Sequence, residues 1–266
     1  MGSLLGIPDI LYKYRVWEDV NHKNSIIGNE LFYASSDLLN DPFDASLPFQ
    51  YDFSILSKDS IIEKLIESGR KNWLGLSEEQ LINKATMRFE EVEVDFGGDW
   101  NELYLDFKKK VNESIGIISL TSKSDNLLMW THYANSHKGF CIGYDKLELF
   151  KQTQGVLARV TYAEEFPKLP FLSENEVDLI DLIMTKSKHW EYEDEYRIIK
   201  SDAPRKKIIL GDNSIKEIVF GCKMEKTSKE EIIAIAQAKF PTIKFYDCVL
   251  DNKQFKLSII PILNTL

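Results

Sequence analysis

One stretch, residues 189–199 (HWEYEDEYRII), constrains the fold most strongly, because it predicts a strand that carries several charges. Aromatic and β-branched residues dominate its second half, as is typical of strands. Alternate residues of a strand share a face. Three carboxylates and one guanidinium are therefore expected on one face: Glu191, Glu193, Glu195 and Arg197. Such carboxylates repel one another, so at least one needs a cationic partner or a raised pKa. The strand predicts either a solvated, ion-paired sheet face or one wall of a functional site.

The length and charge of the chain limit the classes of protein that it can belong to. Its 266 residues suffice for one large domain, or for a domain with an inserted subdomain. Hydrophobic residues make up 44% and charged residues 28%, as in ordinary soluble proteins. The formal net charge of −9 argues against a broad, sequence-independent grip on nucleic acid, which needs clustered Lys and Arg. The net charge remains compatible with binding of a nucleic acid at a single local basic pocket.

The cysteines and the apolar runs bear on the compartment. Cys141, Cys222 and Cys248 are well separated and lie within apolar runs, which indicates small buried hydrophobes in a reducing compartment. The sequence contains no C-x-x-C and no pair of histidines at ligand spacing, so we predict no metal site. No signal peptide and no run of 18 apolar residues is recognisable. We therefore expect a cytoplasmic protein that does not associate with a membrane.

The order of the expected elements predicts the fold class. Several expected strands follow one another through short turns, without strict alternation with helices. This order favours an α+β fold around a mainly antiparallel mixed sheet over a doubly wound fold. The expected strands cover residues 10–17, 30–34, 117–121, 140–144, 156–162, 207–210, 215–220, 243–250 and 255–262, and the expected helices residues 126–136, 177–188 and 226–240.

A helical block interrupts the strands. Apolar residues recur at helical spacing in three segments, residues 61–73, 81–92 and 100–111. Glycines separate these segments, as is typical of helix ends. We therefore predict a single α+β domain over residues 1–266, with a helical insertion or lid over residues 54–116.

Residues 119–144 contain the second informative pattern. On the helix expected there, an amide, an indole, a phenol and an imidazole fall on one stripe: Asn126, Trp130, Tyr133 and His137. Trp and Tyr are often core residues with a satisfied polar tip. A core face does not normally mix these four groups, however, so the stripe predicts the wall of a ligand pocket.

Residues 40–44 (NDPFD) form a third pattern, in which Asx side chains and proline predict a tight turn. The same turn could also position a loop over a pocket.

Motifs for serine hydrolases, P-loop ATPases, zinc proteases and Rossmann enzymes do not occur in the sequence. What remains is chemistry carried out by carboxylates with aromatic and cationic help. Two carboxylates, an aromatic wall and an arginine for phosphate would suit cleavage of a nucleotide's N-glycosidic bond.

Three segments together resemble a bacterial and phage family catalogued as a domain of unknown function. They are NDPFD at 40–44, LMWTHYANSHKGFCIGY at 128–144 and KSKHWEYEDEYRII at 186–199. The resemblance extends from residue 12 to about residue 221, without much of the helical block. The order and spacing of the three segments make it specific.

A second resemblance is to the ADP-ribosyltransferase fold, whose members carry an early Arg or His, a Ser-Thr-Ser-like segment midway and a late Glu-x-Glu. Here these would be Tyr14-Arg15, residues 119–122 (SLTS) and residues 193–195 (EDE). The middle segment departs from the family pattern. The resemblance implies that Arg15 holds the diphosphate or ribose of NAD.

The same resemblance implies roles for the other site residues. Ser119 or Thr121 would support the nicotinamide pocket, Glu195 would stabilise the ribosyl cation, and Glu193 would orient the acceptor. The substrate would be NAD, and the protein could be a toxin or a phage-defence effector that modifies protein or nucleic acid. Within the acidic stretch, Arg197 is expected to be a structural counter-charge and Glu191 an exposed neighbour.

Two other classes of function remain open from the sequence. One is a non-catalytic sensor or interaction module that binds a nucleotide in the same pocket and uses the helical block as its partner surface. The other is a nuclease or glycosidase that uses the same carboxylates; dependence on Mg²⁺ would indicate the nuclease.

Overall fold

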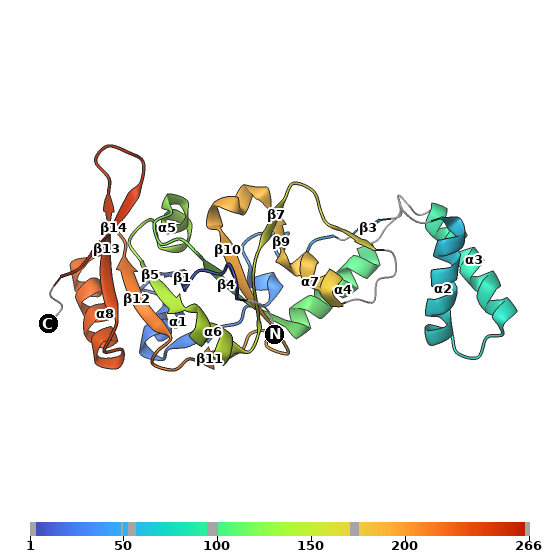
Figure 1. Ribbon diagram of the computed structural model, residues 1–266, viewed down its shortest axis with the longest axis horizontal. Coiled ribbons are helices and arrows are strands. Elements are labelled where there is room, and N and C mark those ends of the chain that lie inside the picture. Colours follow the sequence, from blue (N-terminus) through green and yellow to red (C-terminus); the bar gives the residue numbers. More distant parts are fainter. Residues whose placement is uncertain (1–3, 49, 53–56, 95–100, 171–175, 264–266) are drawn as a thin grey trace.

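An eight-stranded sheet forms the centre of the protein in the computed structural model, which describes residues 4–48, 50–52, 57–94, 101–170 and 176–263. In Figure 1 its strands run from the C-terminal hairpin to the middle of the molecule. In spatial order they are β14 (Leu257–Pro261), β13 (Lys244–Leu250), β12 (Ile215–Phe220), β5 (Phe140–Asp145), β1 (Ile10–Arg15), β4 (Ile115–Thr121), β10 (Glu195–Ser201) and β6 (Val156–Arg159).

Neighbouring strands of this sheet are antiparallel, except for the parallel pair β12 and β13. The predicted α+β class with a mainly antiparallel mixed sheet is therefore confirmed. Among the described residues, three two-stranded sheets accompany it. They pair β2 (Glu30–Phe32) with β11 (Lys207–Ile209), β3 (Gln50–Asp52) with β8 (Lys168–Pro170), and β7 (Thr161–Ala163) with β9 (Thr185–Ser187).

Helices cover both faces of the sheet, because alternate residues of its strands are apolar on both sides. On one face, Ile142 packs in a core that includes Ile26 of α1 (Val20–Ile27) and Ile232 of α8 (Lys226–Lys239). On the other face, Cys141 packs with Trp130 of α5 (Leu127–Tyr133). The short helix α6 (Lys146–Thr153) packs on β5 and adds to the first core.

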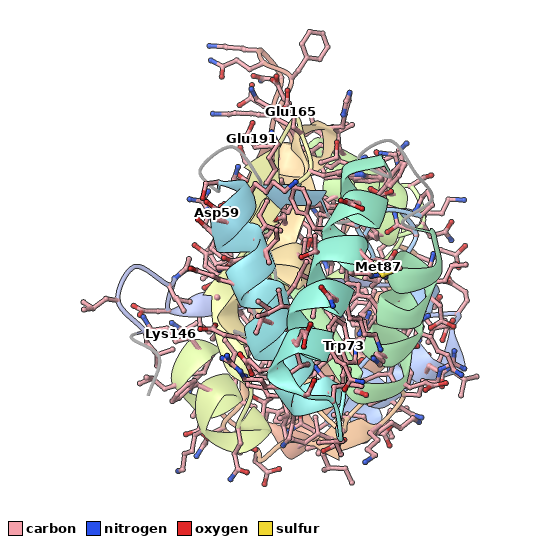
Figure 2. All side chains as sticks on the ribbon, turned by 90° about the vertical axis from the view of Figure 1, so that its right-hand side faces the viewer. Asp59, Trp73, Met87, Lys146, Glu165 and Glu191 are labelled. Carbon is pink, nitrogen blue, oxygen red and sulfur yellow. The ribbon has the colours of Figure 1, made fainter. Side chains whose placement is uncertain are left out.

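The predicted helical block consists of three helices that divide into two parts. The helices α2 (Lys58–Asn72) and α3 (Glu78–Val94) form a hairpin with its own small core, in which Leu65 and Phe89 are buried. The hairpin lies apart from the sheet at one end of the molecule (Figure 1). Figure 2 views the molecule from that end, with Trp73 and Met87 on the hairpin.

The third helix of the block packs against the sheet. The helix α4 (Asn101–Ser114) contributes Val111 to a core shared with Ile117 of β4, Ile199 of β10 and Ile183 of α7 (Glu176–Met184). The predicted boundary at residue 54 and the helix start at residue 100 lie outside the described residues. The division into one domain with an insertion at 54–116 stays a prediction.

The structure also bears on the predictions made from the cysteines and from the apolar runs. Cys141 and Cys248 are buried, Cys222 is half-buried, and all three are free thiols. Within the described ranges, we find no helix that combines the length and the apolarity needed to cross a membrane.

Candidate active site

A cavity of about 470 Å³ opens where the central strands β1 and β4 diverge. The strand β1 pairs with β5 over its whole length, but with β4 at a single position, Tyr12 opposite Thr121. In the gap beyond this pair, the Nζ of Lys13 donates a hydrogen bond of 2.6 Å to the backbone oxygen of Ser119. Residues of α1, β2 and β10 also line the cavity. Its volume lies within the usual range of small-molecule sites, about 300–1,000 Å³.

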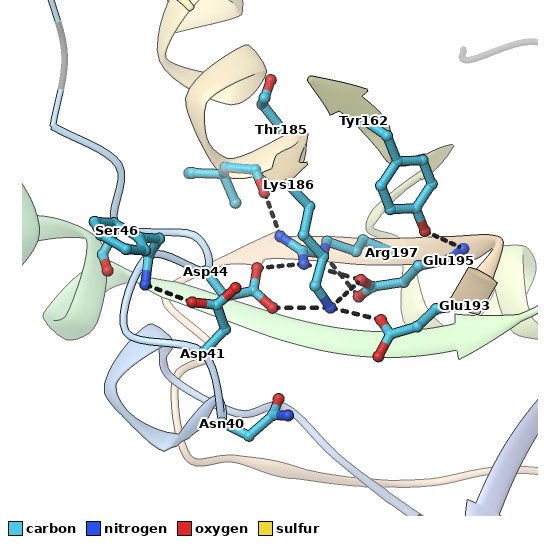
Figure 3. A network of polar contacts seen from close by, with 12 residues as sticks. Asn40, Asp41, Asp44, Ser46, Tyr162, Thr185, Lys186, Glu193, Glu195 and Arg197 are labelled. Atoms are coloured by element: carbon cyan, nitrogen blue, oxygen red, sulfur yellow. Dashed lines mark hydrogen bonds and ion pairs between the residues drawn. The ribbon is translucent and has the colours of Figure 1, made fainter. Parts of the chain in front are cut away.

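One side of the cavity is a buried network of three carboxylates and two cations (Figure 3). The Nζ of Lys186 lies 2.6 Å from Glu193, 3.1 Å from Glu195 and 3.2 Å from Asp44. The Nε of Arg197 lies 2.8 Å from Glu195, and its Nη2 pairs with Asp44. Charged groups are rarely buried unless paired. Here every charge has a partner of opposite sign.

The local backbone delivers the two glutamates to this network in a way that corrects the sequence prediction. Residues 189–199 are not one strand: the 3₁₀ helix η2 (Lys188–Glu193) comes first, and β10 begins only at Glu195. Asp194 joins them with a left-handed backbone, φ 43°. The turn leaves Glu191 exposed and still brings Glu193 into the cavity wall. Alternation therefore places Glu195 and Arg197 on one face, as expected, but not Glu191.

Glu195 is held in its ionised form. Burial opposes ionisation, but the charges of Arg197 and Lys186 outweigh it and lower the pKa of Glu195 to about 2. Ser119 also stabilises the carboxylate. The backbone N–H of Glu195 donates to the hydroxyl of Tyr162 at 2.8 Å, which fixes the start of β10. The predicted role of Arg197 as a counter-charge agrees with this geometry.

Glu193 experiences the opposite effect. Burial raises the pKa of Glu193, although Lys186 and the hydroxyl of Tyr133 act in the other direction. Tyr133 donates a hydrogen bond of 2.6 Å to Oε1 of Glu193, and Asn40 donates to the Tyr133 oxygen at 3.2 Å. The Thr121 hydroxyl donates to the backbone oxygen of Glu193 at 2.5 Å. Two carboxylates of one cavity thus have pKa values shifted in opposite directions.

Asp44 joins the network through the turn at residues 40–44. Asp41 accepts a hydrogen bond of 3.0 Å from the backbone N–H of Phe43, as in an Asx turn. That turn leaves Asp44 buried between Lys186 and Arg197. Both interpretations of NDPFD therefore hold: it is a tight turn, and it contributes to the cavity.

The structure brings most of the predicted binding residues to the cavity. Five of them line it: Tyr14, Arg15, Ser119, Thr121 and Tyr133. Within this set Tyr14 is mainly structural, because its hydroxyl donates to the backbone oxygen of Lys123 at 2.8 Å and its ring packs edge-on against Trp130.

Trp130 and His137 are placed differently from the prediction. The stripe requires a helix to residue 136, but α5 ends at Tyr133, and residues 135–137 have positive φ angles. Trp130 is fully buried, and its Nε1–H donates to the backbone oxygen of Ser124 at 2.8 Å. His137 stacks on the indole. Neither lines the cavity among the described residues, because α5 turns its indole into the core.

A Trp130→Phe substitution tests this core placement. We expect it to lower the free energy of unfolding by about 1–3 kcal/mol, because a buried donor and packing volume are lost. Affinity for a ligand of the cavity should not change. Urea denaturation and ligand titration of the same sample measure both quantities, with Trp73→Phe in the separate hairpin as the control. Weaker ligand binding at wild-type stability would contradict the core placement.

Sequence reasoning missed several residues of the cavity. Lys186 lies within the segment 186–199, and the sequence predicted a cationic partner or a raised pKa for the glutamates. Nothing local to Lys186 selects it over other lysines as that partner. Lys13 was not predicted as a site residue, although strand alternation places it on the same face of β1 as the predicted Arg15. His22 and Tyr162 carried no signal. They line or support the site only because α1 and β7 fold against it.

Comparisons with known proteins give one match. No curated protein and no solved structure matches the chain. A family model described as "Protein of unknown function (DUF2971)" matches residues 129–198. This segment holds four of the five charged groups of the network, all but Asp44. The match bears out, over residues 129–198, the resemblance of the chain to a family of proteins of unknown function, here DUF2971.

Proposed function

We propose that the protein is an ADP-ribosyltransferase-like enzyme that uses NAD as its substrate in the cavity between β1 and β10. The single observation that carries the proposal is the pair Glu193 and Glu195, whose pKa values are shifted in opposite directions within one cavity. Environments that push two carboxylates apart in this way are typical of acid–base assignments in enzymes.

The two shifts fit two different roles. Glu195 stays ionised, so its negative charge would stabilise a positive charge that develops on the ribose of NAD. Glu193 has a raised pKa, so it would accept a proton more readily than an ordinary carboxylate at neutral pH. Tyr133, which donates to Glu193, would orient that carboxylate.

The proposed reaction balances without a metal or an oxidant. The bond between C1′ of the ribose and the nicotinamide nitrogen breaks, and its electron pair leaves with neutral nicotinamide. A nucleophilic oxygen or nitrogen of a protein, of a nucleic acid or of water then bonds to C1′. Its proton passes to Glu193. Proximity of the acceptor to the cation would supply much of the rate.

The test is NAD consumption by the full chain, with and without candidate protein and nucleic-acid acceptors. We expect nicotinamide release by the wild type and a loss of about 100-fold or more in Glu195→Gln, in line with removal of an electrostatic stabiliser. Tyr133→Phe, which keeps the charges, should lower the rate by a smaller factor. Glu191→Gln is the matched control, because Glu191 is exposed and close in sequence. A folded wild type that releases no nicotinamide, or Glu195→Gln with wild-type turnover, would refute the proposal.

A non-catalytic nucleotide-binding module is the second candidate, and one observation favours it. Both carboxylate oxygens of Glu195 already accept hydrogen bonds, from Arg197 and from Lys186. These hydrogen bonds hold the Glu195 carboxylate in one position, as is expected of a rigid wall of a binding site. A rise in melting temperature with NAD or ADP-ribose, without turnover, would support this candidate, because a ligand bound only by the native state raises stability.

A further inference from the structure

Three lysines among the described residues line the cavity, and they differ in their ionic partners. Lys186 lies against three carboxylates of the acidic network, and Lys207 pairs with Glu30 at 3.0 Å. Lys13 of β1 forms no ion pair with the described residues, and its Nζ donates to the backbone oxygen of Ser119 at 2.6 Å. A neutral amine can also donate this hydrogen bond, because one N–H is enough for it. Of these lysines, Lys13 is therefore the one that no ion pair holds in the charged form.

The surroundings of Lys13 favour its neutral amine. Burial and the charge of Arg15, which lies on the same face of β1, lower the pKa of Lys13 well below its usual value. Glu195 acts in the opposite direction, but it forms no ion pair with Lys13 and is held by the acidic network. Burial and the charges of Arg15 and Lys13 lower the pKa of His22 to about 4, so this ring adds no charge near pH 7. The amine of Lys13 is therefore neutral far more often at pH 7 than that of a solvated lysine.

A neutral lysine in a cavity is a nucleophile for carbonyl carbon. Desolvation next to another cationic group is one way in which proteins activate a lysine for this chemistry. The cavity of about 470 Å³ has room for a small molecule beside the amine. Amide and hydroxyl groups of Asn21, Ser25 and Thr121 also line it and offer hydrogen bonds to a hydroxylated ligand. The cavity thus combines an activated amine with a lining that suits a small hydroxylated carbonyl compound.

We propose that Lys13 binds a hydroxylated aldehyde, such as a small sugar in its open-chain form, as an imine in this cavity. The lone pair of Nζ bonds to the carbonyl carbon, and one proton of the amine passes to the carbonyl oxygen. The nitrogen then forms a double bond to that carbon, and the new hydroxyl group leaves with a second proton of the amine as water. Amine and aldehyde give an imine and one water, without an oxidant or a reductant. This reaction goes beyond the proposed function, because it requires neither NAD nor Glu193.

Reductive trapping tests the imine. The full chain is incubated at pH 7 with glyceraldehyde and cyanoborohydride, which reduces an imine to a stable secondary amine, and peptide mass spectrometry locates the modified lysines. We expect Lys13 to react at least about tenfold faster than the exposed Lys253, because less than about 0.1% of an ordinary lysine is neutral at pH 7. Lys186 of the same cavity should stay unmodified. Although burial opposes its charge, the three carboxylates around Lys186 raise its pKa and keep it protonated.

The pH profile separates an activated amine from one that is only accessible. The neutral fraction of an ordinary lysine rises about tenfold per pH unit between pH 6 and 9, and its rate of modification rises with it. The rate at Lys13 should rise far less steeply. Arg15→Met should move the profile of Lys13 to higher pH, because a charge that opposes the ammonium is gone. Arg70→Met, which removes an exposed charge from the separate hairpin, should leave the profile unchanged.

Three results would overturn the inference. They are the absence of a secondary amine at Lys13 in the folded wild type, equal modification of Lys13 and Lys186, and a profile at Lys13 as steep as that of an ordinary lysine. Lys13→Arg keeps a cation but lacks the nucleophile, so the adduct formed at low glyceraldehyde concentration should disappear from its intact mass spectrum. An adduct at Lys13 without NAD turnover would leave the imine standing and refute only the enzymatic proposal. NAD turnover without an adduct would do the reverse.

Discussion

An Arg197→Met variant is expected to unfold with a free energy about 3–5 kcal/mol below that of the wild type, the usual cost of breaking a buried ion pair. Arg197 is fully buried and pairs with both Asp44 and Glu195. Its Nη1 also donates to the backbone oxygen of Ile183 at 2.5 Å. Methionine fills similar space but leaves three buried carboxylates, Asp44, Glu193 and Glu195, to share Lys186. Urea denaturation at pH 7 measures the difference.

Arg159→Met is the control for this prediction. Arg159 also pairs with a carboxylate, Asp194 at 2.5 Å, but its side chain is 62% exposed. An exposed ion pair contributes little, so the expected loss is below about 1 kcal/mol. Equal losses in the two variants would mean that burial of the network does not matter to stability, contrary to its geometry.

A Lys186→Met variant should lose a similar amount, about 3–5 kcal/mol at pH 7.5, and should recover part of it in acid. Lys186 is the cationic partner of Glu193, and Tyr133 is the remaining donor to that carboxylate among the described residues. Burial already raises the pKa of Glu193 above its ordinary 4.5, while Lys186 holds it down. Without Lys186 the pKa in the folded variant rises further.

The sign of the pH effect follows from linkage. In the variant, the folded protein binds a proton at Glu193 more tightly than the unfolded chain does. Stability of the variant relative to the wild type must therefore increase as the pH falls from the raised folded pKa towards 4.5. Denaturation at pH 7.5 and pH 5 should show the gap between variant and wild type narrowing. Lys188→Met, whose pair with Glu164 is exposed, should show a gap below about 1 kcal/mol at both values. A gap that is constant with pH in Lys186→Met would contradict the pairing.

Local pattern was sufficient for the elements and the fold class. Helical spacing of apolar residues predicted α2, α3 and α4, and the succession of short apolar runs predicted a mainly antiparallel sheet. These features depend on residues that are only a few positions apart, so their patterns can be recognised in a single sequence. The same reasoning was wrong for residues 189–199. In the sequence, the alternation of Glu191, Glu193 and Glu195 is compatible with a continuous strand and also with a 3₁₀ helix followed by a strand. In the structure, Asp194 with its left-handed backbone lies between the 3₁₀ helix η2 and the strand β10.

The aromatic stripe shows the same limit. Trp130 and His137 have the spacing of one helical face, but α5 ends between them at Tyr133. The two rings have different surroundings in the structure. Trp130 is buried in the core, whereas the hydroxyl of Tyr133 donates a hydrogen bond to Glu193. The helical spacing, three residues from Trp130 to Tyr133 and seven from Trp130 to His137, does not by itself distinguish these outcomes.

By itself, the sequence indicated that at least one carboxylate of the acidic stretch would have a cationic partner or a raised pKa, because like charges at neighbouring positions repel one another. It also determined the α+β class and the segments that resemble a known family. Only the tertiary structure decided which cations serve, and that Asp44 meets Arg197 across 153 residues of chain. It also decided that β1 and β4 separate after one pair to open the cavity. The physical reason is that propensity acts within a turn or a strand, whereas ion pairs and cavities arise where distant segments are brought together by sheet order and core packing.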